Sequence, residues 1–196
     1  MYEKEYEYIT DRLVEDGFVV IKEMFQDGLD KELLESAKKH TFKQAGISQS
    51  SALHIDNQRR RDKICWLESE DVAQKRFLTF CEGLQNYLNR SLYLGLSYYE
   101  AHFAIYEEGD FYEKHLDSFM GSKNRVVTTV YYLNEDFTKD DGGELLIYDE
   151  ENNLITTVIP QTNTMVIFLS EKFPHEVRPA KKERYSIAGW FRVDKI

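Results

Sequence analysis

Two histidines and one aspartate have the residue types and spacing to bind a metal ion. His115 and Asp117 are two positions apart, between strand-like patterns. Residues i and i+2 of a strand point to the same face, about 6.6 Å apart, so an imidazole and a carboxylate there can share one ion. His175 follows a later strand-like run, 60 residues after His115, and is the natural third ligand. Two histidines and one carboxylate suit non-haem Fe(II) in oxygenases.

The same spacing also has a structural interpretation. His115 can simply donate a hydrogen bond to Asp117 in a folded core. A second His-x-Asp sequence, His54-Ile55-Asp56, lies in a polar stretch before three consecutive arginines, where no sheet would hold it. Surface solvation explains His54 better than metal binding, and the sequence assigns no role to His54 or Asp56.

Arg184 and Ser186 begin the last strand-like run of the chain, nine residues after His175. A metal ion that activates O2 needs a co-substrate that supplies two electrons. A 2-oxo acid can chelate the ion, and its far carboxylate then needs a cation, which an arginine fork matches with two hydrogen bonds. Arg184 and the hydroxyl of Ser186 share one face of a strand. The alternative for Arg184 is a surface salt bridge of little energetic value.

Several motifs occur together in one order along the chain. In order, they are Asp16-Gly17-Phe18-Val19-Val20, Arg61-Asp62-Lys63-Ile64-Cys65-Trp66-Leu67, Ala104-Ile105-Tyr106, Tyr112-Glu113-Lys114-His115-Leu116-Asp117, Tyr131-Tyr132-Leu133-Asn134, Gly142-Gly143-Glu144-Leu145, Pro174-His175-Glu176-Val177, Arg184-Tyr185-Ser186-Ile187 and Trp190. With these motifs the chain resembles Fe(II)- and 2-oxoglutarate-dependent dioxygenases of the prolyl 4-hydroxylase superfamily. The resemblance covers about residues 11–193. It is strongest to the oxygen-sensing prolyl hydroxylases and their bacterial relatives.

The resemblance implies a role for each matching position in the site. It makes His115, Asp117 and His175 the iron ligands. It pairs Arg184 with the far carboxylate of 2-oxoglutarate, to which Tyr132 would donate a hydrogen bond.

Two further aromatic residues match positions around the co-substrate. Tyr106 corresponds to a pocket tyrosine, and Trp190 corresponds to a wall of the site. Tyr106 and Tyr132 can equally be core aromatics. Cys65 and Trp66 are expected to be packing residues rather than catalytic ones.

The resemblance implies hydroxylation of a C–H bond, coupled to conversion of 2-oxoglutarate and O2 into succinate and CO2. Fe(II) would be the metal, with L-ascorbate as a reductant. The substrate class that it favours is a prolyl residue of a protein or peptide. Alternatives within the same chemistry are a free amino acid, a small metabolite or another protein residue.

Two alternatives from other functional classes stay open at this point. One is a non-catalytic jelly-roll binding module, in which His115 and Asp117 form only a structural hydrogen bond. The other is a zinc hydrolase. The hydrolase is disfavoured because no separate glutamate is placed as its base and because it gives Arg184 no role.

Composition narrows the classes of partner. The 196 residues carry a formal net charge of −10, so a surface that follows nucleic-acid phosphates is not expected. No run approaches the roughly 20 apolar residues of a membrane helix, and the acidic N-terminus lacks the apolar stretch of a signal peptide. Cys65 and Cys81 have no metal-finger spacing and suit a reducing compartment. We therefore expect a cytoplasmic protein that binds neither membrane nor nucleic acid.

The elements that must position these residues change type midway along the chain. Apolar spacing predicts helices at 4–15, 29–40 and 71–92 and strands at 18–21, 97–106, 125–134, 144–149, 154–159, 164–169 and 184–193. Helices first and many short strands afterwards predict an α+β fold. The expected architecture is a double-stranded β-helix, or jelly roll, with the N-terminal helices packed on one sheet.

No linker or internal repeat interrupts the chain, so 1–196 is expected to be a single domain. Residues 1–92 would form mainly helical support and 93–193 the jelly-roll core. Residues 43–61 are rich in Gln, Ser, Asn and Arg, which predicts a long mobile loop. The resemblance implies that this loop closes over the substrate.

Overall fold

The computed structural model describes residues 2–49, 52–54, 56, 58–118 and 124–194. The helices are α1 (Glu3–Glu15), α2 (Leu29–Ala37) and α3 (Val72–Leu92), and a 3-10 turn, η1, covers Lys139–Asp141. All three α-helices were predicted, although α2 ends three residues before the predicted position. Asp71 caps α3 because its side chain accepts a hydrogen bond from the backbone N–H of Gln74.

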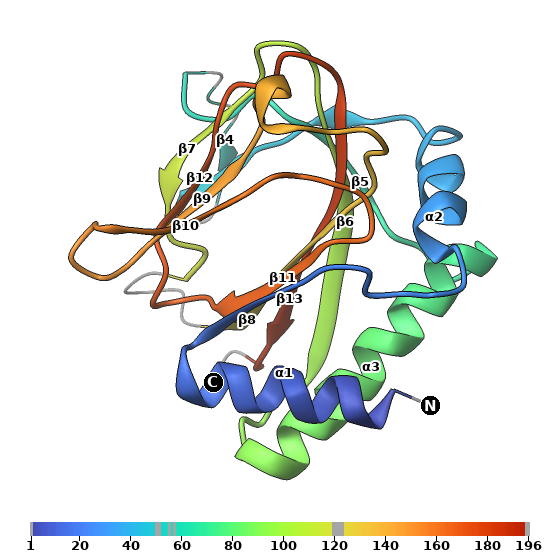
Figure 1. Cartoon of the computed structure of the whole chain (residues 1–196), viewed down its shortest axis with the longest axis vertical. Coiled ribbons are helices and arrows are strands. Elements are labelled where there is room, and N and C mark those ends of the chain that lie inside the picture. The colour runs from blue at the N-terminus through green and yellow to red at the C-terminus, as the bar shows by residue number, and fades with distance from the viewer. Residues whose placement is uncertain (1, 50–51, 55, 57, 119–123, 195–196) are drawn as a thin grey trace.

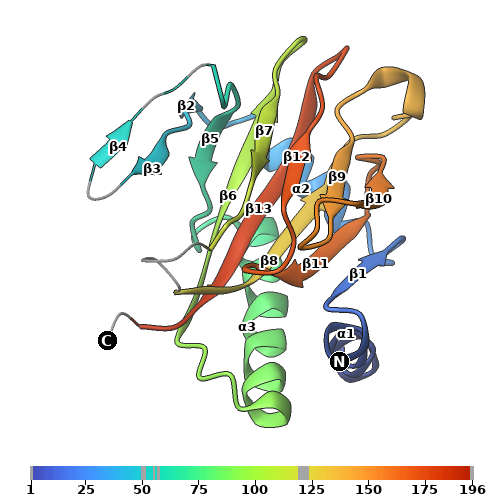
Figure 2. The ribbon, with the colours of Figure 1, turned by 90° about the vertical axis from the view of Figure 1, so that its left-hand side faces the viewer.

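The larger sheet carries the helices on one face, as Figures 1 and 2 show. Its strands, in spatial order, are β1 (Phe18–Ile21), β11 (Met165–Leu169), β8 (Arg125–Tyr132), β13 (Arg184–Arg192), β6 (Tyr98–Tyr106), β5 (Lys63–Trp66) and β2 (Lys43–Gln44). The pairings along this sheet are antiparallel. The N-terminal strand β1 thus lies beside a strand from near the end of the chain.

The smaller sheet faces the larger one on the side away from the helices (Figure 1). Its order is β10 (Leu154–Val158), β9 (Leu145–Tyr148), β12 (His175–Val177) and β7 (Tyr112–His115), again antiparallel. Two antiparallel sheets face to face, with helices outside one of them, confirm the predicted α+β jelly roll. Strands β5, β7 and β12 were not among the predicted strands, because each combines a length of three or four residues with charged or imidazole side chains. The equally short β1 was predicted because all four of its residues are apolar.

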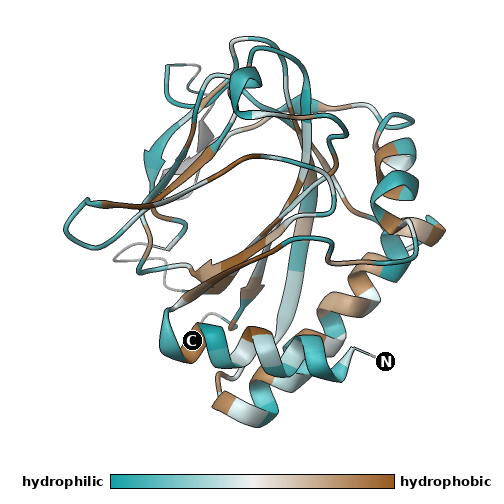
Figure 3. Cartoon of the chain, viewed as in Figure 1, coloured by the Kyte–Doolittle hydropathy of each residue, from teal (hydrophilic) through white to brown (hydrophobic). Residues whose placement is uncertain are grey.

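Successive side chains of the central strands in the larger sheet point to opposite faces, and two separate hydrophobic cores result. Phe103, Tyr131 and Ile187 point toward the helices and pack with apolar residues of α1, α2 and α3. Their neighbours Ala104 and Tyr132 point the other way, into the space between the sheets. Figure 3 shows hydrophobic residues, in brown, along strands between the two sheets, and hydrophilic residues, in teal, on the outer side of the helices. Polar residues on the inward face of these strands therefore line an interior between two sheets.

The segment predicted as a loop at 43–61 contains strands. Strand β2 pairs with β5 at the edge of the larger sheet, and β3 (Ile47–Gln49) pairs with β4 (Ala52–His54) as a separate hairpin. The prediction of an unbroken loop is wrong because runs of two or three residues are too short to show a strand period. The backbone of His54 lies in β4, but its side chain is outside the described residues, as is Ile55. Among the described residues, no helix is long and apolar enough to cross a membrane.

Candidate metal centre and co-substrate pocket

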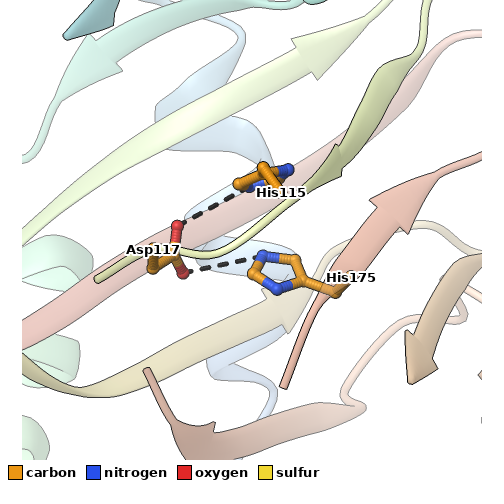
Figure 4. A group of neighbouring side chains, drawn as sticks. All are labelled: His115, Asp117 and His175. Carbon is orange, nitrogen blue, oxygen red and sulfur yellow. Dashed lines mark ion pairs between the residues drawn. The ribbon is translucent and has the colours of Figure 1, made fainter. Parts of the chain in front are cut away.

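Three metal-binding side chains meet between the two sheets. His115 is the last residue of β7, Asp117 follows it just after the strand ends, and His175 opens β12 (Figure 4). Nε2 of His115 lies 3.6 Å from Oδ1 of Asp117, and Nε2 of His175 lies 3.6 Å from Oδ2. One ligand atom from each residue lies within 4.8 Å of the other two. The prediction that His115 and Asp117 share a strand is wrong by two residues, because β7 ends at His115.

Backbone carbonyls fix the two imidazoles in the orientation that a metal requires. Nδ1 of His115 lies 2.8 Å from the carbonyl of Glu113, and Nδ1 of His175 lies 3.0 Å from the carbonyl of Phe173. Because a carbonyl can only accept, each Nδ1 carries the proton and donates it. Both Nε2 lone pairs are then free and directed at Asp117, which is the arrangement of metal-binding histidines.

Asp117 is held as a carboxylate in a nearly closed environment. Burial alone would raise the pKa of its carboxyl, but His175, His115 and Arg125 outweigh burial and hold that pKa well below its usual range. The hydroxyl of Thr128 donates a hydrogen bond of 2.8 Å to Oδ2. The charged form of Asp117 is therefore favoured, and its carboxylate is held in place by Thr128 of β8, a strand of the facing larger sheet.

The rings around the histidines keep both imidazoles in place. Tyr112 stacks on His115 with a centroid distance of 3.6 Å. The guanidinium of Arg60 in turn lies 4.6 Å from the centroid of the Tyr112 ring. Phe168 contacts His175 at 4.8 Å between centroids. Burial, followed by the charge of His115, lowers the pKa of His175 to about 4, so this imidazole stays neutral near pH 7. A neutral imidazole is the form that binds a metal.

A buried cation occupies the far wall of the same cavity. Arg184 is only 1% exposed, yet within the described residues its Nε and Nη1 have no hydrogen-bond partner. The hydroxyl of Tyr132 is likewise buried without one, and the Tyr132 ring lies 5.0 Å from the guanidinium. Burying a charged donor without a partner is costly. These groups therefore point to an anionic ligand that completes their hydrogen bonds.

The other predicted pocket residues lie in the same cavity. The ring of Tyr106 is 4.6 Å from the guanidinium of Arg184, and Ser186 is buried two positions further along β13. Trp190 is nearer the metal ligands, with the guanidinium of Arg125 3.8 Å above its ring. Its Nε1 is buried without a partner among the described residues. All the predicted site residues except Tyr132 therefore line one cavity, and Tyr132 lies behind that lining, against the guanidinium of Arg184.

The residues fit the groups that the sequence pattern implies. Two neutral imidazoles and one carboxylate are the donor set of non-haem Fe(II) sites. Across the cavity, an unpartnered guanidinium and a phenol hydroxyl are the donors that the far carboxylate of 2-oxoglutarate would use. Both ends of a chelating 2-oxo acid thus find a matching partner in one enclosed space.

Sequence reasoning missed several residues of the site. Arg60 and Asp62 form a buried ion pair of 2.6 Å at the mouth of the cavity, and Thr128, Arg125 and His102 line its wall. Only Asp62 lay in a quoted motif, and an isolated threonine or histidine within a strand gives no signal. His102, Arg125 and Thr128 are polar residues on the inward face of the larger sheet, and finding them requires a prediction of strand register. Arg60 and Asp62 lie just before β5, outside the strands of that sheet.

A groove continues from the cavity to the surface beside β5. The two share Arg60, His102, Tyr112, Arg125 and Trp190, and the groove adds residues of β2 and β5. Trp66 lines this groove and is 49% exposed. Its ring packs against His102 in a T-shaped contact, with 5.2 Å between centroids, so Trp66 is a packing residue that lies at the surface of the groove rather than in a core.

Comparison with known proteins agrees with this geometry. Residues 101–192 match the model of the 2OG-Fe(II) oxygenase superfamily. The chain is 30% identical over 199 residues to human Egl nine homolog 1, covering 94% of this chain and 46% of that protein. It spans about half the length of such curated relatives.

Solved structures give the same picture over nearly the whole chain. A prolyl-4-hydroxylase from Pseudomonas putida superposes with a TM-score of 0.87 and 31% identity, covering 97% of this chain and 100% of that one. A prolyl hydroxylase from Trichoplax adhaerens, solved with a peptide fragment of the hypoxia-inducible factor oxygen degradation domain, gives a TM-score of 0.83 and 26% identity. That match covers 97% of this chain and 90% of the other. The chain belongs to the 2OG-Fe(II) oxygenase superfamily and is related to prolyl hydroxylases.

Proposed function

We propose that this protein hydroxylates a prolyl residue of a protein or peptide, using Fe(II), 2-oxoglutarate and O2 and releasing succinate and CO2. The observation that carries the proposal is one cavity with two unlike ends. His115, Asp117 and His175 converge at one end, and the unpartnered Arg184 lies at the other, with the unpartnered hydroxyl of Tyr132 beside it. The relatives named as prolyl hydroxylases support the target class.

Each residue has a distinct task in this reaction. Bound iron would supply the activation of O2 and the oxidative decarboxylation of 2-oxoglutarate. His115 and His175 would bind it through Nε2, and Asp117 would bind it as the anionic ligand. Arg184 would hold the far carboxylate of 2-oxoglutarate through Nε and Nη1, and Tyr132 would donate one more hydrogen bond.

The remaining pocket residues position and enclose the co-substrate. Tyr106 would pack against the bound carboxylate beside Arg184, while the hydroxyl of Ser186 faces the same cavity. Trp190 would close the side of the cavity next to Arg125. Because these walls are aromatic and buried, they exclude water from the reacting centre.

A peptide substrate is supported by the groove that joins the cavity to the surface. The groove runs along β5 and includes Trp66, His102 and Tyr112, whose rings offer broad apolar faces. Aromatic-lined grooves are a common way of binding proline-containing segments. We propose that the segment at 43–61, which borders this groove, covers the bound peptide.

The proposal also covers the reductant, the cellular location and the domain organisation of the protein. L-ascorbate would serve as a reductant that keeps the iron in the ferrous state. A cytoplasmic location is supported by the free thiols of Cys65 and Cys81, which suit a reducing compartment. We also propose that residues 1–196 act as one domain, with neither membrane nor nucleic acid as a partner.

The test is mass spectrometry of proteins from a cell extract after incubation with the enzyme, Fe(II), 2-oxoglutarate and ascorbate. The expected result is a mass increase of 16 on a proline, formed only when 2-oxoglutarate is present and accompanied by succinate. The Asp117→Ala variant is the matched control and should give no product. Succinate formation with the mass increase on another residue, or on a metabolite, would contradict prolyl hydroxylation while keeping the oxygenase chemistry.

A further inference from the structure

His102 is a buried imidazole at the point where the cavity meets the groove. It lies on β6, is 2% exposed, and lines both spaces. Its ring is held between Trp66 and Trp190, with centroid distances of 5.2 Å and 5.4 Å. Two tryptophans therefore fix the plane of this ring, and neither the metal ligands nor the Arg184 pocket uses it.

The hydrogen bonding of His102 leaves one atom available. Nδ1 lies 3.2 Å from the backbone carbonyl of Phe103, so Nδ1 carries the proton and donates it. The hydrogen bonds of the described residues include none at Nε2, and Nε2 is not among the buried side-chain atoms left without a partner, so this atom is open to the cavity that His102 lines. In a neutral ring with a proton on Nδ1, Nε2 can only accept.

The charge state of the ring supports this assignment. Burial, followed by the nearby charge of Arg60, lowers the pKa of His102 to about 4. The imidazole is therefore neutral around pH 7, and its Nε2 keeps a lone pair. Because His102 lines both the cavity and the groove, this fixed acceptor can receive a hydrogen bond from a donor of the molecule that enters the groove.

A prolyl peptide offers a restricted set of such donors. Proline itself has no backbone N–H. The nearest donor to the prolyl ring is the N–H of the following residue, because that nitrogen is bonded directly to the prolyl carbonyl carbon. The N–H of the preceding residue is separated from the ring by a further Cα and carbonyl carbon.

We propose that Nε2 of His102 accepts a hydrogen bond from the backbone N–H of the residue that follows the target proline. This inference rests on the proposed prolyl hydroxylation and makes His102 a specificity-determining residue. A second proline directly after the target has no N–H to give. Sequences with two consecutive prolines are therefore poor substrates at the first of them.

The test uses a synthetic peptide spanning the hydroxylated proline and its depsipeptide analogue. In the analogue, an ester oxygen replaces the N–H of the residue after the proline. One neutral hydrogen bond contributes about 0.5–1.5 kcal/mol, so kcat/KM of the wild-type enzyme should fall about 2- to 10-fold with the ester. The KM for 2-oxoglutarate should be unchanged, because Arg184 lies at the other end of the cavity.

Two substitutions of His102 complete the experiment. His102→Leu should lower kcat/KM for the normal peptide and remove its advantage over the ester, because the acceptor is gone. His102→Gln restores an acceptor oxygen near Nε2 and should recover part of that advantage. Equal turnover of the amide and ester peptides by the wild-type enzyme overturns the role of His102 even if the Leu variant does not fold. Absence of any proline hydroxylation by the wild-type enzyme contradicts the proposed function instead.

Discussion

His115 and His175 are direct cross-strand partners: β7 and β12 pair them in register, and their ring centroids are 4.3 Å apart. Their Nε2 atoms both face Asp117, which comes from the turn after β7. A one-residue slip in this pairing would turn one imidazole to the opposite face of the sheet. The proposed metal centre therefore depends on the register of two strands of only three and four residues.

Replacing the carboxylate is expected to remove most of the metal affinity. Asp117→Asn keeps the shape of the side chain and an acceptor for Thr128 but loses the charge. We expect about a 100-fold or greater loss in Mn(II) affinity, measured by calorimetry with Mn(II) as a redox-stable substitute for Fe(II). Thr128→Val keeps the ligand but removes the hydrogen bond to Asp117 together with the one to the buried Ser170, and should lower the Mn(II) affinity about 10- to 100-fold. Equal affinity of wild type and Asp117→Asn would exclude Asp117 as a ligand.

The buried guanidinium is expected to set the affinity for 2-oxoglutarate. Arg184→Ala removes the charged donors at Nε and Nη1, and hydrogen bonds to charged groups contribute about 1.5–3 kcal/mol. The dissociation constant for 2-oxoglutarate should rise about 10- to 100-fold in calorimetry with Mn(II) present. Tyr132→Phe removes one neutral donor, so its effect should be several times smaller. A larger effect of Tyr132→Phe would reverse these roles.

Two glycines with positive φ allow the effect of backbone strain on stability to be distinguished from the effect of a displaced Arg184 on 2-oxoglutarate binding. Gly143 has φ +68°, and a Cβ there would lie 3.0 Å from Cδ of Arg184. Gly109 has φ +85° with nothing within 4 Å of the added atom. Alanine at either position should destabilise the protein by about 1 kcal/mol through the positive φ alone, measured by urea denaturation. Only Gly143→Ala should also weaken 2-oxoglutarate binding, because it displaces Arg184.

Acid is expected to begin destabilising the metal-free protein near pH 6.5, before most carboxylates titrate. Burial lowers the pKa of both His102 and His175 from 6.5 to about 4. Between these values the unfolded chain binds a proton at each histidine and the folded protein does not, so stability falls as the pH decreases from 6.5 toward 4. The slope should be about 1.4 kcal/mol per pH unit for each group.

Urea denaturation of the metal-free protein across this pH range measures that slope. His102→Gln removes one of the two groups and should reduce the slope by about half. A free energy of unfolding that stays constant between pH 6.5 and 4 would mean that these imidazoles are already charged in the folded protein.

Two neighbouring arginines should differ sharply in their contribution to stability. Arg60 pairs with the fully buried Asp62 at 2.6 Å, whereas Arg59 and Glu113 form a largely exposed pair. Arg60→Ala leaves a buried carboxylate without its partner, which should cost about 3–5 kcal/mol. Arg59→Ala should cost less than about 1 kcal/mol. Similar effects in chemical denaturation would show that Asp62 reaches water once Arg60 is removed.

The sequence revealed more of the site than of the strands that carry it. His115, Asp117 and Arg184 stand out because their residue types have few other uses at that spacing. Strands β7 and β12 escape prediction because their few residues include charged and imidazole side chains and so show neither a period nor an apolar run. Both are stabilised by neighbours far along the chain. The long, regular α3 could be predicted to within a residue for the opposite reason.

The residues around the ligands were the hardest to foresee. Thr128 and His102 matter because of the face on which they lie, and that face is set by the pairing of β6, β8 and β13 rather than by local sequence. The exposure of Trp66 was not foreseen for a similar reason, since an aromatic residue in an apolar stretch is usually buried. Its exposure follows from the position of β5 near the edge of the sheet, beside the groove.

The short strand β1 has a practical consequence for anyone who shortens this chain. It covers the edge of β11 with antiparallel pairs from Phe18 opposite Phe168 to Ile21 opposite Met165. A truncation before residue 22 would leave the run Met165–Leu169 with unpaired backbone groups along one side. Exposed apolar edges of this kind template intermolecular pairing. Such a fragment would keep every proposed ligand yet precipitate, so inactivity of an N-terminally trimmed preparation would report aggregation rather than chemistry.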